Sequence, residues 1–490
     1  GLIAIRAAVA AKVNITYKIL FNDAVAMTGG QPMDGELTPA RITRQVRSEG
    51  VERIAVVSDY PDKYPVSEPF ASGVTIHHRD EMDVLQESLR EETGVSVLIY
   101  DQVCAAEKRR RNRNQRQAAT EKHIFINEQV CDGCGDCGEV SNCLSITPLE
   151  TAFGRKRSIN QSSCNTDFSC LDGFCPSFVT VEGAALKVFH QDAPLDTSDL
   201  PEPEFPVPQG DYNVLITGIG GTGVVTIASL LGNAANLDGK NVQVLDQTGL
   251  SQKFGAVMSH VRIADADTNL FAPRISEGAV DVLLGCDLLV SASSETLRYL
   301  NPARAVTAVN CHEEMTSAFL FDRNFDVMGS SLQSQLRRHV RLNGYSSIDA
   351  TQIAKQLLGD TIGTNILLLG YAWQRGLLPV SEASLTKVIE LQGSAIARNK
   401  RAFALGRIAA ANPARLKLEL HGAPRKHTLE ELVNNRADYL CHYQDQTYAD
   451  RYLAAVREIE KIESAPCTAK DKPLTRAVAE NYFNLLAYKD

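Results

Sequence analysis

Residues 131–143 read CDGCGDCGEVSNC, and residues 164–176 read CNTDFSCLDGFCP. Seven of the twelve cysteines of the chain lie between Cys131 and Cys175. A large chain with this density of cysteine in one short stretch is typical of metal binding rather than of disulfide bonding, and it indicates a reducing compartment. The two stretches therefore predict a metal-binding domain in the middle of the sequence.

The spacing of both stretches is close to the iron-sulfur motif of bacterial ferredoxins, C-x2-C-x2-C-x3-C-P. The first stretch supplies Cys131, Cys134, Cys137 and Cys143, although its last gap holds five residues and no proline follows. The second stretch supplies Cys164, Cys170, Cys175 and Pro176. The position of its middle cysteine is occupied by Asp167.

In two-cluster ferredoxins, the fourth cysteine of each half binds the cluster that is held mainly by the other half. This exchange predicts one [4Fe-4S] cluster with four thiolate ligands, which are Cys131, Cys134, Cys137 and Cys175. It predicts a second cluster with three cysteines and one other ligand, which are Cys143, Cys164, Cys170 and Asp167.

The fourth ligand of the second cluster has several alternatives. Asp167 binds the iron, or water or hydroxide does, or the iron is lost and a three-iron cluster remains, because a carboxylate is a harder ligand than a thiolate. Alternatively, Asp167 only caps a turn and Cys104 is the eighth ligand. Structural zinc in place of iron is the remaining alternative, although zinc sites favour paired knuckles of cysteine.

Composition excludes two classes of partner. The 490 residues carry a formal net charge of −9 and 44% hydrophobic residues. An acidic chain gives no global attraction to nucleic acid, and no apolar run approaches the roughly 18 residues of a membrane helix. The first residues lack the basic start and cleavage site of a signal peptide. We expect a cytoplasmic homo-oligomer, and we interpret both ends of the sequence as cuts in a longer polypeptide.

The chain divides by composition into five parts. Residues 1–117 alternate strand and helix patterns, which predicts a parallel sheet, and end in the basic linker KRRRNRNQR. The cysteine-rich domain spans 118–190, and a proline-rich linker spans 191–210. Residues 211–412 form a second α/β pattern that predicts a doubly wound sheet, with one strand over 280–292 and mostly helix over 361–412. Residues 413–490 are predicted to be a partial helical region.

A glycine-rich loop lies at Gly218, Gly220 and Gly223, after one predicted strand and before a helix. With Asp246 ending the next strand, this context fits a dinucleotide-binding fingerprint. It supports an alternative function, an iron-sulfur electron-transfer subunit with a nicotinamide or flavin at this loop. A loop that serves only the turn and the packing of its helix would explain the glycines equally well.

A further motif, FNDAVAMTGGQ at 21–31, follows a predicted strand, where parallel sheets place ligands. A plain turn would explain its glycines too. However, it resembles the strand-end motif of the thiamine diphosphate domain in 2-oxoacid:ferredoxin oxidoreductases. The resemblance implies that Asn22 and Ala24 give oxygens to Mg²⁺, which holds the cofactor diphosphate, and that the cofactor-binding loop contains Gly29, Gly30 and Gln31. The upstream Gly-Asp-Gly of that family is not in this chain, nor is its activating acid.

The resemblance extends over nearly the whole sequence. YDQVCAAEKRRR, the two cysteine stretches, GIGGTGVVTIASLLG and GLSQKFGAVMSHVRI are similar to the large fused bacterial indolepyruvate ferredoxin oxidoreductases. The implied fold is multidomain α/β: the C-terminal part of a thiamine diphosphate domain, a ferredoxin-like α+β domain with two [4Fe-4S] clusters, a Rossmann-like gamma-type domain and the helical region. Lys253 and His260 resemble an active-site-facing stretch, although a buried core histidine is an equally good interpretation.

The resemblance implies an enzyme that oxidatively decarboxylates aryl 2-oxoacids such as indolepyruvate, with thiamine diphosphate and Mg²⁺ as cofactors. The acyl group passes to coenzyme A, and the electrons pass through the clusters to ferredoxin. The other implied partner is the remainder of its own enzyme or its subunits. The sequence does not identify a catalytic residue.

Overall fold

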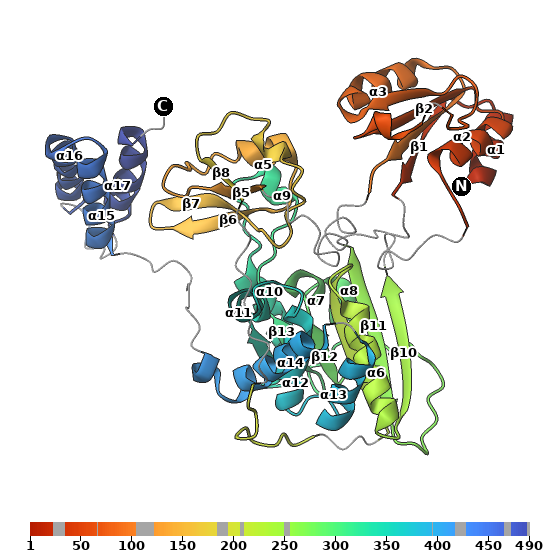
Figure 1. The fold of residues 1–490 in the computed structure, drawn as a ribbon. Helices are drawn as coiled ribbons and strands as arrows, with labels where there is room; N and C mark the ends of the chain where they lie inside the picture. Colours follow the sequence, from red (N-terminus) through yellow and green to blue (C-terminus); the bar gives the residue numbers. More distant parts are fainter. Residues whose placement is uncertain are drawn as a thin grey trace. The chain divides into compact units, whose positions relative to one another are not determined.

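A computed structural model describes residues 1–22, 35–65, 67–103, 122–183, 195–205, 210–248, 255–393, 395–416, 428–464 and 472–487. The chain forms two compact units, Gly1–Ala119 and Thr120–Asp490 (Figure 1). Each unit is described separately below.

The first unit contains a four-stranded parallel sheet in the order β1-β4-β2-β3. Its elements are α1 (Leu2–Ala10), β1 (Ile15–Phe21), α2 (Pro39–Ser48), β2 (Arg53–Ser58), η2 (Pro61–Lys63), β3 (Thr75–His78), η3 (Arg79–Glu81), α3 (Met82–Glu91) and β4 (Val95–Asp101). Helices α1 and α2 pack on one face of the sheet and α3 packs on the other.

The parallel sheet predicted from the alternating pattern is confirmed. The central strands β2 and β4 are buried on both faces, as their nearly continuous apolar sequences RIAVVS and VSVLIYD require. Strand β3 was not predicted, because TIHH is a short edge strand with alternate residues exposed. All four carboxyl ends align, since Phe21 and Ser58 both pair with Asp101 and Ser58 also pairs with His78.

The second unit begins with a small α+β region. Its elements are β5 (Lys122–Ile126), α5 (Asp136–Ser141), β6 (Ile146–Thr151), β7 (Gly154–Ile159), η4 (Ser169–Leu171) and β8 (Phe178–Glu182). Strand β5 pairs antiparallel with β8, and β6 pairs antiparallel with β7. The cysteine-rich stretches form the connections between these strands.

A six-stranded mixed sheet follows, in the order β10-β11-β9-β12-β13-β14. Its strands are β9 (Asp211–Ile219), β10 (Asn241–Thr248), β11 (Ala256–Ala264), β12 (Val282–Gly285), β13 (Val306–Asn310) and β14 (Tyr345–Ile348). Strand β11 runs antiparallel to both of its neighbours, whereas β9, β12, β13 and β14 are mutually parallel.

Helices cover both faces of this sheet, so the predicted doubly wound layering is correct (Figure 1). One face packs against α6 (Val224–Leu237), α11 (Ala350–Leu358), α12 (Thr364–Gln374), α13 (Glu382–Leu391) and α14 (Ile396–Ala411). The other packs against α7 (Leu288–Ser291), α8 (Ser294–Leu297) and α10 (Gly329–Arg338). Successive residues of β9 alternate between the two cores, with Val214 and Ile216 in the first and Leu215 in the second.

The predicted strand over 280–292 is wrong beyond Gly285. Strand β12 ends there, and α7 begins because the Asp287 side chain accepts a hydrogen bond from Val290 N at 2.8 Å, which caps the helix. The helical prediction for 361–412 is confirmed by α12, α13 and α14. The remaining short elements are α9 (Ala318–Phe321) and η5 (Pro413–Leu416).

The C-terminal region is helical, as predicted. It contains α15 (Leu429–Tyr443), α16 (Gln446–Ser464) and α17 (Pro473–Leu486) around an aromatic core. Phe153, from the turn between β6 and β7, joins this core at 5.2 Å from the Tyr439 ring and 5.5 Å from the Phe483 ring. Among the described residues, none of the helices is both long and apolar enough to cross a membrane.

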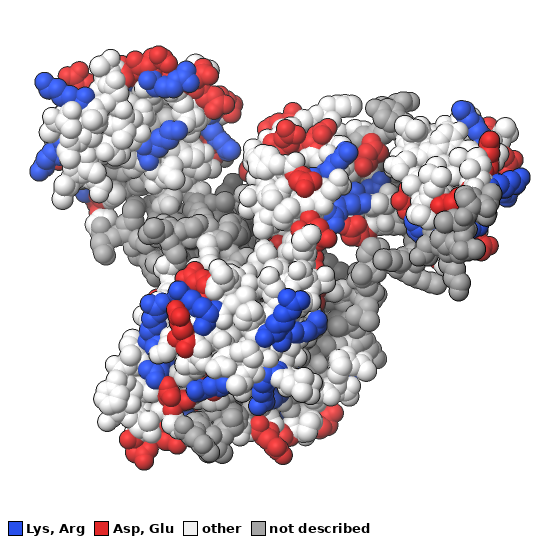
Figure 2. All heavy atoms as spheres, turned by 180° about the vertical axis from the view of Figure 1, so that it is seen from behind, with Lys and Arg blue, Asp and Glu red and all other residues white. Residues whose placement is uncertain are grey.

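Charges are mixed on the surface. On the face drawn in Figure 2, Lys and Arg side chains of the described residues are interspersed with Asp and Glu. The described part of this face therefore carries no large surface of one sign.

Candidate functional site

The two cysteine stretches fold as two copies of one turn. Each begins with an asparagine directly after a strand, Asn127 after β5 and Asn160 after β7. Cys131 N donates to Asn127 O at 2.9 Å, and Cys164 N donates to Asn160 O at 3.0 Å. Both first cysteines are therefore held by the same backbone hydrogen bond, thirty-three residues apart.

The correspondence continues at the sulfur atoms and at the last cysteine of each half. Gly133 N donates to Cys131 Sγ at 3.3 Å, and Thr166 N donates to Cys164 Sγ at 3.4 Å. The last cysteines, Cys143 and Cys175, each precede a strand. Cys143 O accepts a hydrogen bond from Ile146 N at 3.2 Å, and Cys175 O accepts one from Phe178 N at 3.4 Å. The small α+β region is thus a pseudo-twofold repeat.

The backbone between the cysteines needs left-handed conformations. In the first half they fall on glycines, Gly133 with φ +74° and Gly135 with φ +94°. A Cβ at Gly133 would lie 2.1 Å from the Arg155 carbonyl oxygen, so only glycine fits there. In the second half the same path is followed by Thr166 (φ +53°) and Phe168 (φ +61°). Non-glycine residues in this strained conformation are typical of functional sites.

The first group of cysteines lines one cavity. Cys131, Cys134, Cys137 and Cys175 surround it together with Arg157 and Phe174, and its volume is about 50 Å³. This is several times the roughly 10–15 Å³ that one water needs. Burial raises the pKa of Cys137 to about 11, and the nearby thiols of Cys131, Cys134 and Cys175 add to this effect. The four predicted ligands of the first cluster are therefore brought together.

The second group gathers around Cys170. Burial raises the pKa of this thiol to about 11, with further contributions from Cys143, Cys164 and Asp167. Asp167 stands thirty-three residues after Cys134, in the corresponding place of the repeat. Its Oδ1 accepts hydrogen bonds from Ser169 N at 3.4 Å and Ser169 Oγ at 3.1 Å, as a turn cap does. Cys104, the alternative ligand, lies outside the described residues.

The donors fit a polynuclear cluster. Across the described ranges, no three His, Cys, Asp or Glu side chains converge on the position of a single metal ion. A four-iron cluster takes one thiolate at each iron, and Cys131, Cys134, Cys137 and Cys175 around this cavity would be the residues to hold it. Thiols whose pKa is raised by burial and by one another become thiolates when a bound metal supplies positive charge.

The predicted thiamine motif is only partly described. Asn22 lies directly after β1 at the carboxyl edge of the first sheet, whereas Ala24, Gly29, Gly30 and Gln31 lie outside the described residues. At the same edge, Asp101 pairs with Lys63 at 2.9 Å and accepts a hydrogen bond from the Tyr64 hydroxyl. Burial and Asp101 together raise the pKa of Tyr64 far above its usual range. This edge is where parallel sheets bind ligands.

The glycine-rich loop packs closely against its own domain. Gly218 is the penultimate residue of β9, and a Cβ there would lie 2.7 Å from Val224 Cγ2 and 3.0 Å from Cys286 Cβ. Gly220 N donates to Gly255 O at 2.8 Å, and Gly223, the N-cap residue of α6, has φ +96°. The glycines therefore serve the turn and its packing.

The position of Asp246 argues against a dinucleotide site. It lies on β10, and the antiparallel strand β11 separates β10 from β9. Neighbouring strands lie about 4.8 Å apart, so the intervening strand places Asp246 one strand farther from the glycine-rich loop than in a dinucleotide site. Its carboxylate instead accepts a hydrogen bond from Ser259 Oγ.

His260 is a buried core residue rather than a site residue. Its Nδ1 accepts from Ile275 N at 3.3 Å, so Nε2 carries the proton and donates to Gln247 Oε1 at 3.1 Å. Burial lowers the pKa of His260 to about 4, and the charges of Arg274 and Arg298 lower it further. Lys253, its neighbour in the predicted active-site stretch, lies outside the described residues.

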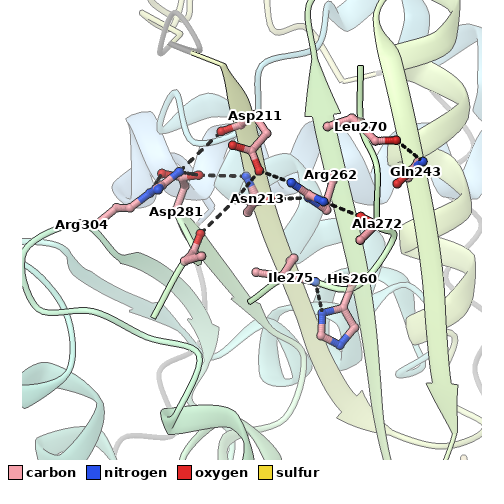
Figure 3. Close-up of polar contacts among 11 residues, drawn as sticks. Asp211, Asn213, Gln243, His260, Arg262, Leu270, Ala272, Ile275, Asp281 and Arg304 are labelled. Carbon is pink, nitrogen blue, oxygen red and sulfur yellow. Dashed lines mark hydrogen bonds and ion pairs between the residues drawn. The ribbon is translucent and has the colours of Figure 1, made fainter. Parts of the chain in front are cut away.

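A polar network that the sequence did not predict lies beside His260 (Figure 3). Arg262 contacts Asp211, Asn213 Oδ1 and the Ala272 carbonyl, and Arg304 forms a two-point ion pair with Asp281. The network joins the start of β9 to β11 and to the segment after it. It lies at the amino end of β9, opposite the ligand-binding edge, and we interpret it as structural.

Sequence reasoning also missed two arginines of β7. Arg155 donates to the Phe325 carbonyl at 2.7 Å, and the Arg157 guanidinium lies 4.0 Å from the centre of the Phe319 ring. Phe319 is on α9, in the larger α/β region. The run GRKRSI carried a signal, since alternation along a strand places residues 155 and 157 on one face. The sequence did not indicate that the contacts of these two arginines are Phe325 and Phe319.

Comparison with known proteins identifies the larger α/β region. Residues 213–409 match the family described as pyruvate ferredoxin/flavodoxin oxidoreductase. The indolepyruvate oxidoreductase subunit IorB of Pyrococcus horikoshii is 33% identical over 204 residues, which are 94% of that subunit and 40% of this chain. The chain belongs to the 2-oxoacid:ferredoxin oxidoreductase family. The predicted resemblance is thereby confirmed at this level.

Further similarities each cover part of this chain. The IorB subunit of Thermococcus kodakarensis is 30% identical over 208 residues, covering 94% of that subunit and 40% of this chain. The pyruvate oxidoreductase subunit PORC of Thermotoga maritima is a solved structure with 23% identity and a TM-score of 0.30, covering 96% of that chain and 41% of this one. Residues 429–490 match a family of unknown function.

The neutral His260 predicts a pH dependence of stability. Its pKa of about 4 in the folded chain lies below the value of about 6.5 expected after unfolding. Its stabilising contribution is therefore complete above pH 6.5 and is lost as the pH falls toward 4. Between pH 7.5 and pH 5, the free energy of unfolding of the parent should fall by about 2 kcal/mol more than that of His260→Gln.

Chemical denaturation between pH 5 and 7.5 measures this difference. His442→Gln, which removes an exposed histidine, is the control and should follow the parent. Parallel pH profiles for the parent and His260→Gln would contradict the assignment of a buried neutral imidazole.

Proposed function

We propose that the pseudo-twofold region binds two [4Fe-4S] clusters. The observation that carries the proposal is the gathering of Cys175 with Cys131, Cys134 and Cys137 around one cavity, although Cys175 belongs to the other half of the repeat. This is the exchange of ligands expected for a two-cluster ferredoxin. The second cluster would be held by Cys143, Cys164 and Cys170, with Asp167 at its fourth corner.

We propose further that the first unit holds part of a thiamine diphosphate site. The side-chain oxygen of Asn22 and the backbone oxygen of Ala24 are hard ligands suited to Mg²⁺, and Gly29, Gly30 and Gln31 would form the adjoining loop. The carboxyl edge of the parallel sheet, where Asn22 lies, supports this assignment. The Gly-Asp-Gly ligand and the activating acid would come from the remainder of the enzyme.

The proposed reaction is the oxidative decarboxylation of an aryl 2-oxoacid such as indolepyruvate. The 2-oxoacid loses CO₂, its acyl group forms a thioester with coenzyme A, and two electrons pass singly to ferredoxin. Bound thiamine diphosphate supplies the carbanion chemistry that makes decarboxylation feasible. The residues of this chain would hold the clusters, exclude water from them and set their potentials. The IorB relatives support indolepyruvate as the substrate.

Anaerobic reduction of the full-length enzyme tests the proposed reaction. With thiamine diphosphate, Mg²⁺ and coenzyme A present, indolepyruvate should bleach the visible iron-sulfur absorbance, and omission of thiamine diphosphate should abolish the bleaching. Pyruvate and 2-oxoglutarate serve as controls for side-chain preference and should react more slowly. Bleaching by NADH or NADPH, with none by any 2-oxoacid, would instead indicate a nicotinamide-linked electron-transfer subunit.

Asp167→Cys tests whether Asp167 is the fourth ligand of the second cluster. A thiolate in this place completes the four-cysteine pattern, so the variant should fold and should shift the potential and EPR spectrum of one cluster only. Asp172→Cys, at an exposed position on the same loop, controls for an added thiol. Unchanged redox titration and EPR in Asp167→Cys would show that Asp167 is a turn cap, and the eighth ligand would then be Cys104 or solvent.

A further inference from the structure

Arg157 is a buried cation at the first group of cysteines. Its side chain is on β7 with 2% of its surface exposed, and it lines the same cavity as Cys131, Cys134, Cys137 and Cys175. A Cβ placed on Gly135 would lie 3.1 Å from Arg157 Nη2, so the guanidinium lies against the loop that joins Cys134 to Cys137. Its positive charge interacts with the thiols of Cys137, Cys131 and Cys134.

The guanidinium lacks a counter-ion within the part of the chain that the structure describes. Nη1 is buried and has no hydrogen-bond partner there, and no described carboxylate forms an ion pair with Arg157. Its neighbour Arg155, by contrast, pairs with Glu150. A buried guanidinium N–H group without a hydrogen-bond partner is unfavourable, because its desolvation is not offset. The arrangement indicates a missing negative group at Nη1.

The position of the guanidinium is fixed from another part of the chain. Its central carbon lies 4.0 Å from the centre of the Phe319 ring, and Phe319 is itself only 2% exposed. This cation–π contact restrains the guanidinium, and Arg157 also lines the cysteine cavity. Phe319 comes from α9, so the α/β region positions a charge at the cysteine site.

We propose that Arg157 is a positioning residue that donates hydrogen bonds from its guanidinium to sulfur atoms of the cluster at Cys131, Cys134, Cys137 and Cys175, and thereby raises the reduction potential of that cluster. This inference rests on the proposed iron-sulfur function. Four thiolates leave the cluster with net negative charge, and reduction adds one electron without making or breaking a bond. A buried cation stabilises the reduced form more than the oxidised form.

Redox titration monitored by EPR on the full-length protein tests the inference. Arg157→Met keeps an unbranched side chain but removes the charge and the donors, and we expect it to lower one of the two cluster potentials. A tenfold change in the reduction equilibrium corresponds to about 59 mV for a one-electron couple, and we expect at least this shift. Arg157→Lys keeps the charge and should restore part of the shift.

Arg323→Met is the matched control. Arg323 is an exposed cation beside the same loop, and its Cβ would lie 3.8 Å from a Cβ on Gly135. Solvent screens its charge, so the variant should leave both potentials unchanged. Equal potentials in Arg157→Met and Arg323→Met would overturn the inference, as would an equal shift of both clusters in Arg157→Met.

Thermal unfolding provides a readout that is independent of potential. In the iron-free protein the buried charge has no partner, so Arg157→Met should leave the unfolding temperature unchanged or raise it. In the iron-loaded protein the same variant should lower it. Equal destabilisation of both forms would show that Arg157 is merely structural and would overturn the proposal. A parent protein without iron at these cysteines would instead remove the proposed iron-sulfur function itself.

Discussion

The exchange of one cysteine between the two halves of the α+β region is the constraint on which the rest of the site depends. Neither half can complete its group of ligands alone, because Cys175 lies with the first half and Cys143 with the second. The matching hydrogen bonds at Cys131 and Cys164 keep the two turns in the same geometry. The left-handed Thr166 and Phe168 show that this geometry is kept even where no glycine relieves its strain.

The β6–β7 hairpin links this site to the remainder of the second unit. Phe153 at its turn packs into the aromatic core of the C-terminal helices, and Arg155 and Arg157 on β7 contact α9 and the segment after it. This hairpin thus contacts both the C-terminal helices and the α/β region, and Arg157 on its strand β7 lines the cysteine cavity. A change in the α/β region that moves Phe319 would move Arg157 at the cysteine cavity, so Arg157 physically connects the cysteine-rich region with the α/β region.

The sequence predicted what local spacing determines. The grouping of the cysteines and the placement of Asp167 followed from ligand spacing, and the parallel first sheet followed from nearly continuous apolar strands. The sequence did not predict which strands pair when they lie far apart along the chain. The insertion of β11 between β9 and β10 separates Asp246 from the glycine-rich loop, although their spacing in the sequence fits a dinucleotide fingerprint. His260 and Arg157 show the same limit, since only the folded chain reveals that one is a satisfied core residue and the other a buried cation.

Anaerobic iron and sulfide analysis, combined with EPR of the fully reduced full-length protein, tests the central claim most directly. Two clusters at the repeated turns predict about eight irons per chain and an EPR spectrum broadened by magnetic interaction between two reduced clusters. About four irons with one isolated signal would contradict the second site. Zinc in place of iron would contradict both.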